Sequence, residues 1–237
     1  MSAANDLQIY ERHASAWWDR SDRFFRSLHS VGNFHAGCMR WEWGEHLQGA
    51  RLVDLGCGGG GVSLALAAAG AEVQGIDQSP GSVEAARQAA AERGLDAQFQ
   101  TGDLRQTGLE AASADFVVMS DVLEHIEQPS EAIAEAARIL RPGGELFVNT
   151  FDRSWWSRFT VVTLAEGLGL VPRGTHDGRL FVRPAELTVF GKEHGLVLRS
   201  LQRERPAIFA TLRSWTIHLR RARRGPGYHA FLRRLEA

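Results

Sequence analysis

A glycine-rich loop that follows a short apolar segment constrains the fold of this 237-residue chain more than any other feature. Val53-Asp54-Leu55 predicts the end of a strand, and the chain then enters Gly56-Cys57-Gly58-Gly59-Gly60-Gly61. Glycine has no Cβ, so the backbone of such a loop can approach a bound ligand closely. A second predicted strand ends at Asp77, about 20 residues after Gly56, where folds of this kind bind the two ribose hydroxyls of a nucleoside. The pattern predicts a site for an adenosine-containing cofactor.

Two classes of cofactor are compatible with the loop taken alone. Gly56, Gly58 and Gly61 satisfy the G-x-G-x-x-G pattern of dinucleotide-binding proteins, so an NAD-type oxidoreductase is one alternative. Asp54 favours a different ligand, because its carboxylate would repel a pyrophosphate at the start of the following helix but suits a sulfonium or an amino group. The expected cofactor contacts in this region are Asp54, Gly56, Cys57, Gly58, Gly60, Asp77 and Gln78.

The middle of the chain alternates predicted strands with predicted helices, which favours a parallel sheet joined by right-handed crossovers. Strands are expected at 51–55, 72–77, 98–100, 115–120, 145–150, 196–201 and 208–212. The expected fold is therefore α/β, a Rossmann-like, doubly wound and mostly parallel seven-stranded sheet. Ligands of such sheets bind beyond the carboxyl ends of the strands. One crevice should therefore contain the residues that follow the strands: Gly56, Asp77, Asp103, Ser120, Asp121, Asn149 and Thr150.

The whole chain, 1–237, is expected to form a single domain with additions around this core. Residues 1–48 are rich in tryptophan and predict an N-terminal helical cap, and residues 49–150 form the cofactor-binding core. Residues 151–180 interrupt the strand order and predict a lid insertion. Residues 181–237 return to the sheet and end in an arginine-rich tail.

Composition argues against several classes of protein. The formal net charge of −1 gives no reason to expect nucleic acid as a partner, and no base-flipping motif follows the fourth strand. The two cysteines cannot build a disulfide framework, which favours a reducing, cytoplasmic location. We find neither a signal-peptide pattern nor a run of about 18 apolar residues that would span a membrane.

Four motifs together resemble those of class I S-adenosylmethionine-dependent methyltransferases: Asp54-Leu55-Gly56-Cys57-Gly58, Asp77, Asp121-Val122-Leu123-Glu124-His125 and Leu140-Arg141-Pro142-Gly143-Gly144. Three more runs are similar to the ubiquinone-biosynthesis O-methyltransferase family: Trp17-Trp18-Asp19, Val171-Pro172-Arg173-Gly174-Thr175-His176-Asp177 and Phe181-Val182-Arg183-Pro184-Ala185-Glu186-Leu187. The resemblance covers roughly residues 8–200. It implies S-adenosylmethionine as the cofactor and a catechol-type hydroxyl of a polyprenylated quinone precursor as the methyl acceptor. A soluble aromatic or secondary metabolite as acceptor, and a cofactor-binding module without catalysis, remain alternatives.

The chain departs from the family pattern at two places that bear on the site. The family usually carries an arginine in the N-terminal helix that contacts the cofactor carboxylate, and the matching stretch 33–37 has none. The family's Tyr-Asn-Pro near the substrate is replaced by Glu204-Arg205-Pro206. The methyltransferase class survives both departures, which concern the acceptor more than the class.

Methyl transfer from a sulfonium requires an in-line nucleophile, so a phenolic acceptor must be both positioned and deprotonated. Asp121, Glu124 and His125 are the expected catalytic residues, because positions i, i+3 and i+4 at the start of a helix share one face. Three interpretations remain open. The three side chains hold a divalent ion (Mg²⁺ if oxygen ligands dominate, Zn²⁺ if histidine does), His125 acts alone as a base, or the motif is structural. The resemblance supports the metal.

The remaining expected contacts follow later strands or lie in the insertion. Asp103 is expected to accept a hydrogen bond from the adenine amino group, with Leu104 and Ser120 also beside the cofactor. Substrate or lid roles are expected for Asn149, Thr150, Trp156 and His176.

The segment 155–170 carries aromatic residues at one end, as interfacial helices do, and Arg220–Arg224 would attract anionic lipid. These two features predict a mobile lid that contacts a membrane, and hence a cytoplasmic protein peripheral to the inner membrane. A core-packing helix and a set of solvated arginines are the alternative interpretations.

Overall fold

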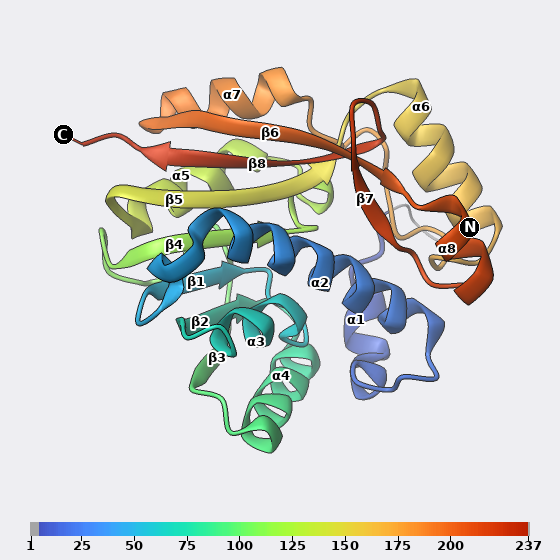
Figure 1. The fold of residues 1–237 in the computed structure, drawn as a ribbon, viewed down its shortest axis with the longest axis horizontal. Coiled ribbons are helices and arrows are strands. Elements are labelled where there is room, and N and C mark those ends of the chain that lie inside the picture. The colour runs from blue at the N-terminus through green and yellow to red at the C-terminus, as the bar shows by residue number, and fades with distance from the viewer. Residues whose placement is uncertain (1–4, 237) are drawn as a thin grey trace.

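The computed structural model describes residues 5–236, and one sheet of eight strands runs through its centre (Figure 1). The strands are β1 (Arg51–Leu55), β2 (Glu72–Asp77), β3 (Ala97–Thr101), β4 (Ala114–Ser120), β5 (Leu140–Phe151), β6 (Leu196–Pro206), β7 (Leu219–Ala222) and β8 (Gly227–Arg234). Their order across the sheet is β3-β2-β1-β4-β5-β8-β6-β7. The strands β1 to β5 pair in parallel, whereas β8 runs antiparallel to β5 and β6, and β7 antiparallel to β6. The expected Rossmann-like α/β fold is confirmed.

Helices cover both faces of the sheet, and α2 crosses the face turned to the viewer in Figure 1. Phe116 and Val118 of β4 face a cluster with α2 and α3, and Val117 and Met119 face a cluster with α5 and α7. This alternation buries the central strand on both sides. The helical segments are α1 (Gln8–Arg12), η1 (Ala14–Ala16), α2 (Arg23–Trp43), η2 (Gly44–Leu47), α3 (Gly61–Ala67), α4 (Pro80–Arg93), η3 (Leu123–His125), α5 (Pro129–Ile139), α6 (Trp155–Ser157), η4 (Arg158–Ala165), α7 (Pro184–Glu193) and α8 (Ile208–Ser214).

Local signals in the sequence explain where α4 begins and ends. Ser79 is its N-cap and accepts a hydrogen bond from the backbone N–H of Ser82, and Pro80 occupies the first helical position. Gly94 ends the helix in the left-handed conformation, with φ of 62°. This helix carries the chain from the predicted ribose-binding acid at the end of β2 back to β3.

The C-terminal part of the sheet differs from the expectation of seven strands. Residues 208–212, expected to be a strand, form part of α8, and the arginine-rich tail instead supplies the edge strand β7. The run Ile-Phe-Ala-Thr-Leu at 208–212 is uncharged, and a short run of this kind does not distinguish strand from helix by periodicity.

The predicted lid insertion contains α6 and a π-helical stretch, η4. A π-helix is a rare form of backbone that is frequent at functional sites. Trp155 and Trp156 of α6 are 76% and 49% exposed. No helix within residues 5–236 is long and apolar enough to cross a membrane.

Candidate active site

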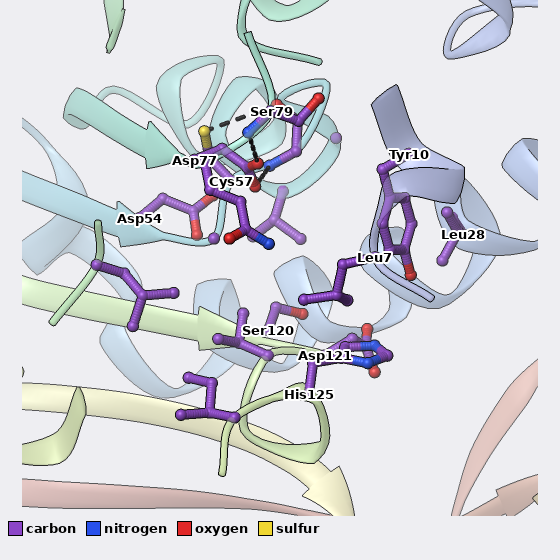
Figure 2. A pocket seen from close by; sticks show the side chains of 18 of the residues that line it. Leu7, Tyr10, Leu28, Asp54, Cys57, Asp77, Ser79, Ser120, Asp121 and His125 are labelled. Carbon is purple, nitrogen blue, oxygen red and sulfur yellow. Dashed lines mark hydrogen bonds between the residues drawn. The ribbon is translucent and has the colours of Figure 1, made fainter. Parts of the chain in front are cut away.

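A pocket of about 560 Å³ opens at the carboxyl ends of β1 to β4. Figure 2 shows Asp77, Cys57 and Ser79 on one side of it and Ser120, Asp121 and His125 on another. The predicted site residues that line this pocket are Asp54, Gly56, Cys57, Gly58, Asp77, Gln78, Asp103, Leu104, Ser120, Asp121 and His125. The predicted site residues that lie outside its lining are Gly60, Glu124, Asn149, Thr150, Trp156 and His176.

The glycine loop is held against other side chains so closely that a Cβ would not fit. A Cβ on Gly56, which has φ of +80°, would lie 2.5 Å from Cγ2 of Val122, and one on Gly59 would lie 2.4 Å from Cδ2 of Trp17. The indole nitrogen of Trp18 donates to the carbonyl oxygen of Gly59 at 3.1 Å. The two tryptophans therefore fix the backbone of the loop in place from outside the sheet.

Asp77 joins the glycine loop to the turn after β2. Its Oδ2 accepts from the backbone N–H of Gly58 at 2.8 Å, and its Oδ1 accepts from that of Ser79 at 2.9 Å. Burial raises the pKa of this carboxyl, and the two backbone N–H groups oppose that rise. Each carboxylate oxygen has two lone pairs, so both oxygens can accept a further hydrogen bond from a ligand hydroxyl.

Two other acids of the pocket differ sharply in exposure. Asp54 is 1% exposed, accepts from the hydroxyl of Ser63, and has its pKa raised by burial to about 7. The side chain of Asp103 is 48% exposed and pairs with Arg105 at 2.7 Å. This hydrogen bond to the guanidinium lowers the pKa of Asp103, so the carboxylate is ionised at the pocket rim.

The chain after β4 does not begin a helix at Asp121, and this overturns the expectation that Asp121, Glu124 and His125 converge. Asp121 has a left-handed φ of 55°, and a short 3₁₀ turn follows at Leu123–His125. The Oδ1 of Asp121 accepts from Nδ2 of Asn149 at 2.7 Å, and its Oδ2 faces His35 instead of His125. The i, i+3, i+4 rule fails here because it applies only to helical backbone.

A different set of side chains comes together beside the pocket. Glu124, His125 and His176 each offer one ligand atom, and these atoms lie within 4.8 Å of one another. The rings of His125 and His176 stack with centroids 5.5 Å apart. The Oε2 of Glu124 accepts from the hydroxyl of Thr150 at 2.7 Å. Oε1 of Glu124 and Nδ1 of His176 are buried without a hydrogen-bond partner in residues 5–236.

Burial controls the protonation of this cluster. It raises the pKa of Glu124 to about 8, with a further contribution from the nearby charge of Asp121. It lowers the pKa of His125 to about 3, with a further contribution from His176. His125 is therefore a neutral imidazole at neutral pH, which is the form that binds metals, and its low pKa makes it a weak base for proton abstraction.

The N-terminal segment, for which the sequence predicted a helical cap, supplies side chains to the wall of the pocket. Tyr10 and Leu7 project into the pocket in Figure 2. Oδ1 of Asn5 lies 2.7 Å from Nδ1 of His125, and the ring of Tyr10 packs edge-on to the same imidazole at 6.3 Å. The backbone N–H of Asp6 donates to the carbonyl of Gly174 at 3.1 Å. The sequence predicted a helical cap for residues 1–48, but it gave no signal for the contact between Asn5 and His125.

The expected substrate and lid residues take other positions. Asn149 and Thr150 are buried and bond to Asp121 and Glu124, so they stand behind the pocket wall. His176 is brought to the site by the 174–176 turn, whereas Trp156 is half-exposed and lies outside the pocket lining.

Comparison with known proteins agrees with this geometry. A family described as a methyltransferase domain matches residues 53–148. The ubiquinone biosynthesis O-methyltransferase of Nitrosococcus oceani is 34% identical over 199 residues, which cover 83% of this chain and 83% of that protein. The protein of the same name from Stutzerimonas stutzeri is 35% identical over 206 residues, covering 83% of this chain and 84% of that protein.

Solved structures share the fold at lower identity. The magnesium protoporphyrin IX methyltransferase of Synechocystis, with bound SAH, superposes with a TM-score of 0.69 at 22% identity, covering 97% of this chain and 95% of that chain. An S-adenosylmethionine-dependent methyltransferase of Thermotoga maritima gives a TM-score of 0.68 at 19% identity, covering 96% and 99%. These likenesses concern the fold alone.

A glycine loop after β1, an acid at the end of β2 and a pocket at the carboxyl ends of parallel strands, together with the match to a methyltransferase domain, identify a class I S-adenosylmethionine-dependent methyltransferase. The curated relatives place the chain more narrowly. It belongs to the ubiquinone biosynthesis O-methyltransferase family, and it is an S-adenosylmethionine-dependent O-methyltransferase with a small-molecule substrate.

Proposed function

We propose that this enzyme transfers a methyl group from S-adenosylmethionine to a catechol-type hydroxyl of a polyprenylated precursor in ubiquinone biosynthesis. The observation that carries the proposal is the place of His125, which lines the cofactor pocket and also belongs to the cluster with Glu124 and His176. An acceptor oxygen bound at this cluster would lie at the edge of the cofactor site, as an in-line displacement requires. The name of the curated relatives supports the pathway.

The proposed orientation of the cofactor follows from the pocket wall. Asp77 binds the ribose hydroxyls, because it lines the pocket and each of its oxygens accepts one backbone N–H and can accept a further hydrogen bond. Asp103 and Leu104 bind the adenine, and the glycine loop passes along the methionine part of the ligand. The sulfonium and its methyl group then point toward Ser120 and Asp121, on the side of the pocket that adjoins His125.

We propose that Glu124, His125 and His176 hold a divalent ion. The fit rests on the donor set: Nδ1 of His125 faces an oxygen of Asn5, which leaves Nε2 free, and Oε1 of Glu124 is buried without a hydrogen-bond partner among residues 5–236. Nδ1 of His176 faces Oε1 of Glu166 at 3.6 Å, which orients that imidazole. Two imidazoles and one carboxylate favour a transition ion such as Zn²⁺ over Mg²⁺. When bound, the ion would favour the phenolate form of the acceptor. Catalysis by His125 alone is the weaker alternative, since its pKa is lowered to about 3.

We also propose that the protein contacts an anionic membrane through the end of the molecule where α6 and α8 lie (Figure 1). Soluble proteins seldom leave large apolar side chains exposed together. Arg220 and Arg221 lie in β7, and Arg223 and Arg224 directly follow it. Positive charge of this kind is attracted to anionic lipid. The exposed apolar residues here are Trp155 and Trp156 in α6, Phe159 in η4, and Ile208, Phe209 and Leu212 in α8.

The decisive experiment is methylation with labelled S-adenosylmethionine of a panel that pairs prenylated catechol precursors with soluble catechols of the same ring. The proposal expects product only, or far more of it, from the prenylated compounds. Equal rates on both would assign the enzyme to soluble aromatic acceptors. Labelled product on neither, from folded protein that binds the cofactor, would refute catechol methylation.

A further inference from the structure

A group of ionisable side chains is buried beneath the pocket. Glu204 of β6 is 3% exposed, and the histidines that contact it, His35 of α2 and His229 of β8, are 0% and 3% exposed. Nε2 of His35 lies 3.0 Å from Oε2 of Glu204, and Nδ1 of His229 bonds to the other carboxylate oxygen. Burying a carboxylate is unfavourable unless a partner of opposite charge compensates it. The charge of Glu204 outweighs the effect of burial and raises the pKa of His35, which favours the protonated imidazole.

The other ring nitrogen of His35 connects this buried group to the pocket. Nδ1 of His35 lies 4.0 Å from Oδ2 of Asp121, and this nitrogen has no hydrogen-bond partner within residues 5–236. The side chain of Asp121 is 28% exposed and lines the pocket, and its other oxygen is held by Asn149. A histidine cation thus lies between a fully buried carboxylate and a carboxylate of the pocket wall.

We propose that His35 is a positioning residue that favours the ionised form of Asp121 in the pocket wall beside the sulfonium, so that the enzyme binds S-adenosylmethionine in preference to S-adenosylhomocysteine. The cofactor carries a positive charge on sulfur, and the product is a neutral thioether, while the two share every other group. A carboxylate near that sulfur therefore attracts only the methyl donor. Release of the product is favoured by the same arrangement. The inference rests on the proposed orientation of the cofactor.

The test is calorimetric binding of both ligands to the wild type, His35→Gln and Glu204→Gln. In His35→Gln the dissociation constant of S-adenosylmethionine should rise about tenfold, or about 1.4 kcal/mol. The dissociation constant of S-adenosylhomocysteine should change less than about twofold. Glu204→Gln should shift the ratio of the two in the same direction, because it removes the charge that holds His35 protonated.

Trp43→Phe is the matched control. Trp43 is also buried on α2 and donates to a carboxylate, Oε2 of Glu145, at 3.0 Å, but it lies outside the pocket lining. This variant should lose stability and leave the ratio of the two affinities unchanged. A purely structural role of His35 would give the same result for His35→Gln as for Trp43→Phe.

Equal weakening of both ligands in His35→Gln, or an unchanged ratio, would overturn the inference. If that variant does not fold, Asp121→Asn should reproduce the loss of preference, and Glu204→Gln should add nothing in the Asp121→Asn background. An additive effect of the two changes would overturn the inference as well. A wild type that binds neither ligand would refute the proposed function itself, which separates the two failures.

Discussion

Nδ1 of His125 lies 2.7 Å from Oδ1 of Asn5, so the first described residue of the chain reaches a site residue 120 positions further on. A second bond runs from Nδ2 of Asn5 to the backbone oxygen of His125 at 3.1 Å. An amide oxygen can only accept, so Nδ1 of His125 carries the proton and Nε2 presents its lone pair to the cluster. This bond ties the N-terminal segment to the orientation of the imidazole.

Asn5→Ala should therefore loosen the imidazole without disturbing the cofactor end of the pocket. A group that orients a metal-binding histidine typically contributes about 10- to 100-fold in metal affinity or activity. We expect a loss of turnover in that range, with the affinity for S-adenosylhomocysteine nearly unchanged. Turnover and calorimetry on the same preparation check this, and a variant with wild-type turnover would show that the Asn5 bond is dispensable.

Asp77→Ala should weaken the binding of S-adenosylmethionine by about 2–5 kcal/mol, because two hydrogen bonds from ribose hydroxyls to a charged acceptor are lost. Asp103→Ala is a graded comparison, since Asp103 is half-exposed and already paired with Arg105. Its loss should weaken binding less. Calorimetry with NAD completes the measurement, and binding of NAD more tightly than S-adenosylhomocysteine would contradict the assigned cofactor.

The cofactor side of the pocket could be predicted from the sequence because each of its residues is fixed locally. Gly56 and Asp77 directly follow strands, and parallel strands bring their carboxyl ends to one edge whatever the rest of the chain does. The acceptor side could not be predicted in the same way. His176 and Glu124 are 52 residues apart in the sequence, and no periodicity encodes such a contact.

Two errors have distinct physical causes. Asp121 was expected to share a helical face with Glu124, but its left-handed backbone turns the side chain toward Asn149 and His35. Residues 208–212 were expected to be a strand, and a short uncharged run of this kind fits a helix equally well. Glu204 lies in a segment that departs from the family pattern, so the resemblance gave no indication of its buried partners.

The metal proposal predicts that EDTA abolishes turnover and that a divalent ion restores it. His125→Ala and His176→Ala should each lose turnover far more than cofactor affinity. His194→Ala is the control, because that imidazole bonds Ser130 and lies outside the cluster. Full activity in the chelator would rule out the ion, and wild-type turnover in both site variants would leave the cluster without a catalytic role.

The raised pKa of Glu124 has a consequence for stability in metal-free protein. Its pKa is about 8 in the folded state and about 4.3 in the unfolded state, so between these values the folded protein binds more protons. The contribution of this group is then fully favourable below about pH 4 and is lost as the pH rises toward 8. Glu124→Gln should therefore gain in melting temperature over the wild type as the pH rises from 5 to 8. Thermal unfolding in EDTA measures this, and parallel curves for the two proteins would contradict it.

The membrane proposal predicts that Trp156→Ser with Phe159→Ser, and separately Phe209→Ser, reduce cosedimentation with anionic liposomes. Raised salt should reduce it too, because the exposed arginines at 220, 221, 223 and 224 act electrostatically. Trp41→Ser is the control, because Trp41 is 79% exposed but lies away from the proposed contact surface. Arg26, near the start of α2, bonds to Thr216 beside α8, whereas Trp41 lies near the other end of that helix. Its loss should leave cosedimentation unchanged. Folded wild-type protein that does not cosediment with anionic liposomes at low salt would refute the membrane contact. A soluble aromatic acceptor would then be favoured over a polyprenylated one.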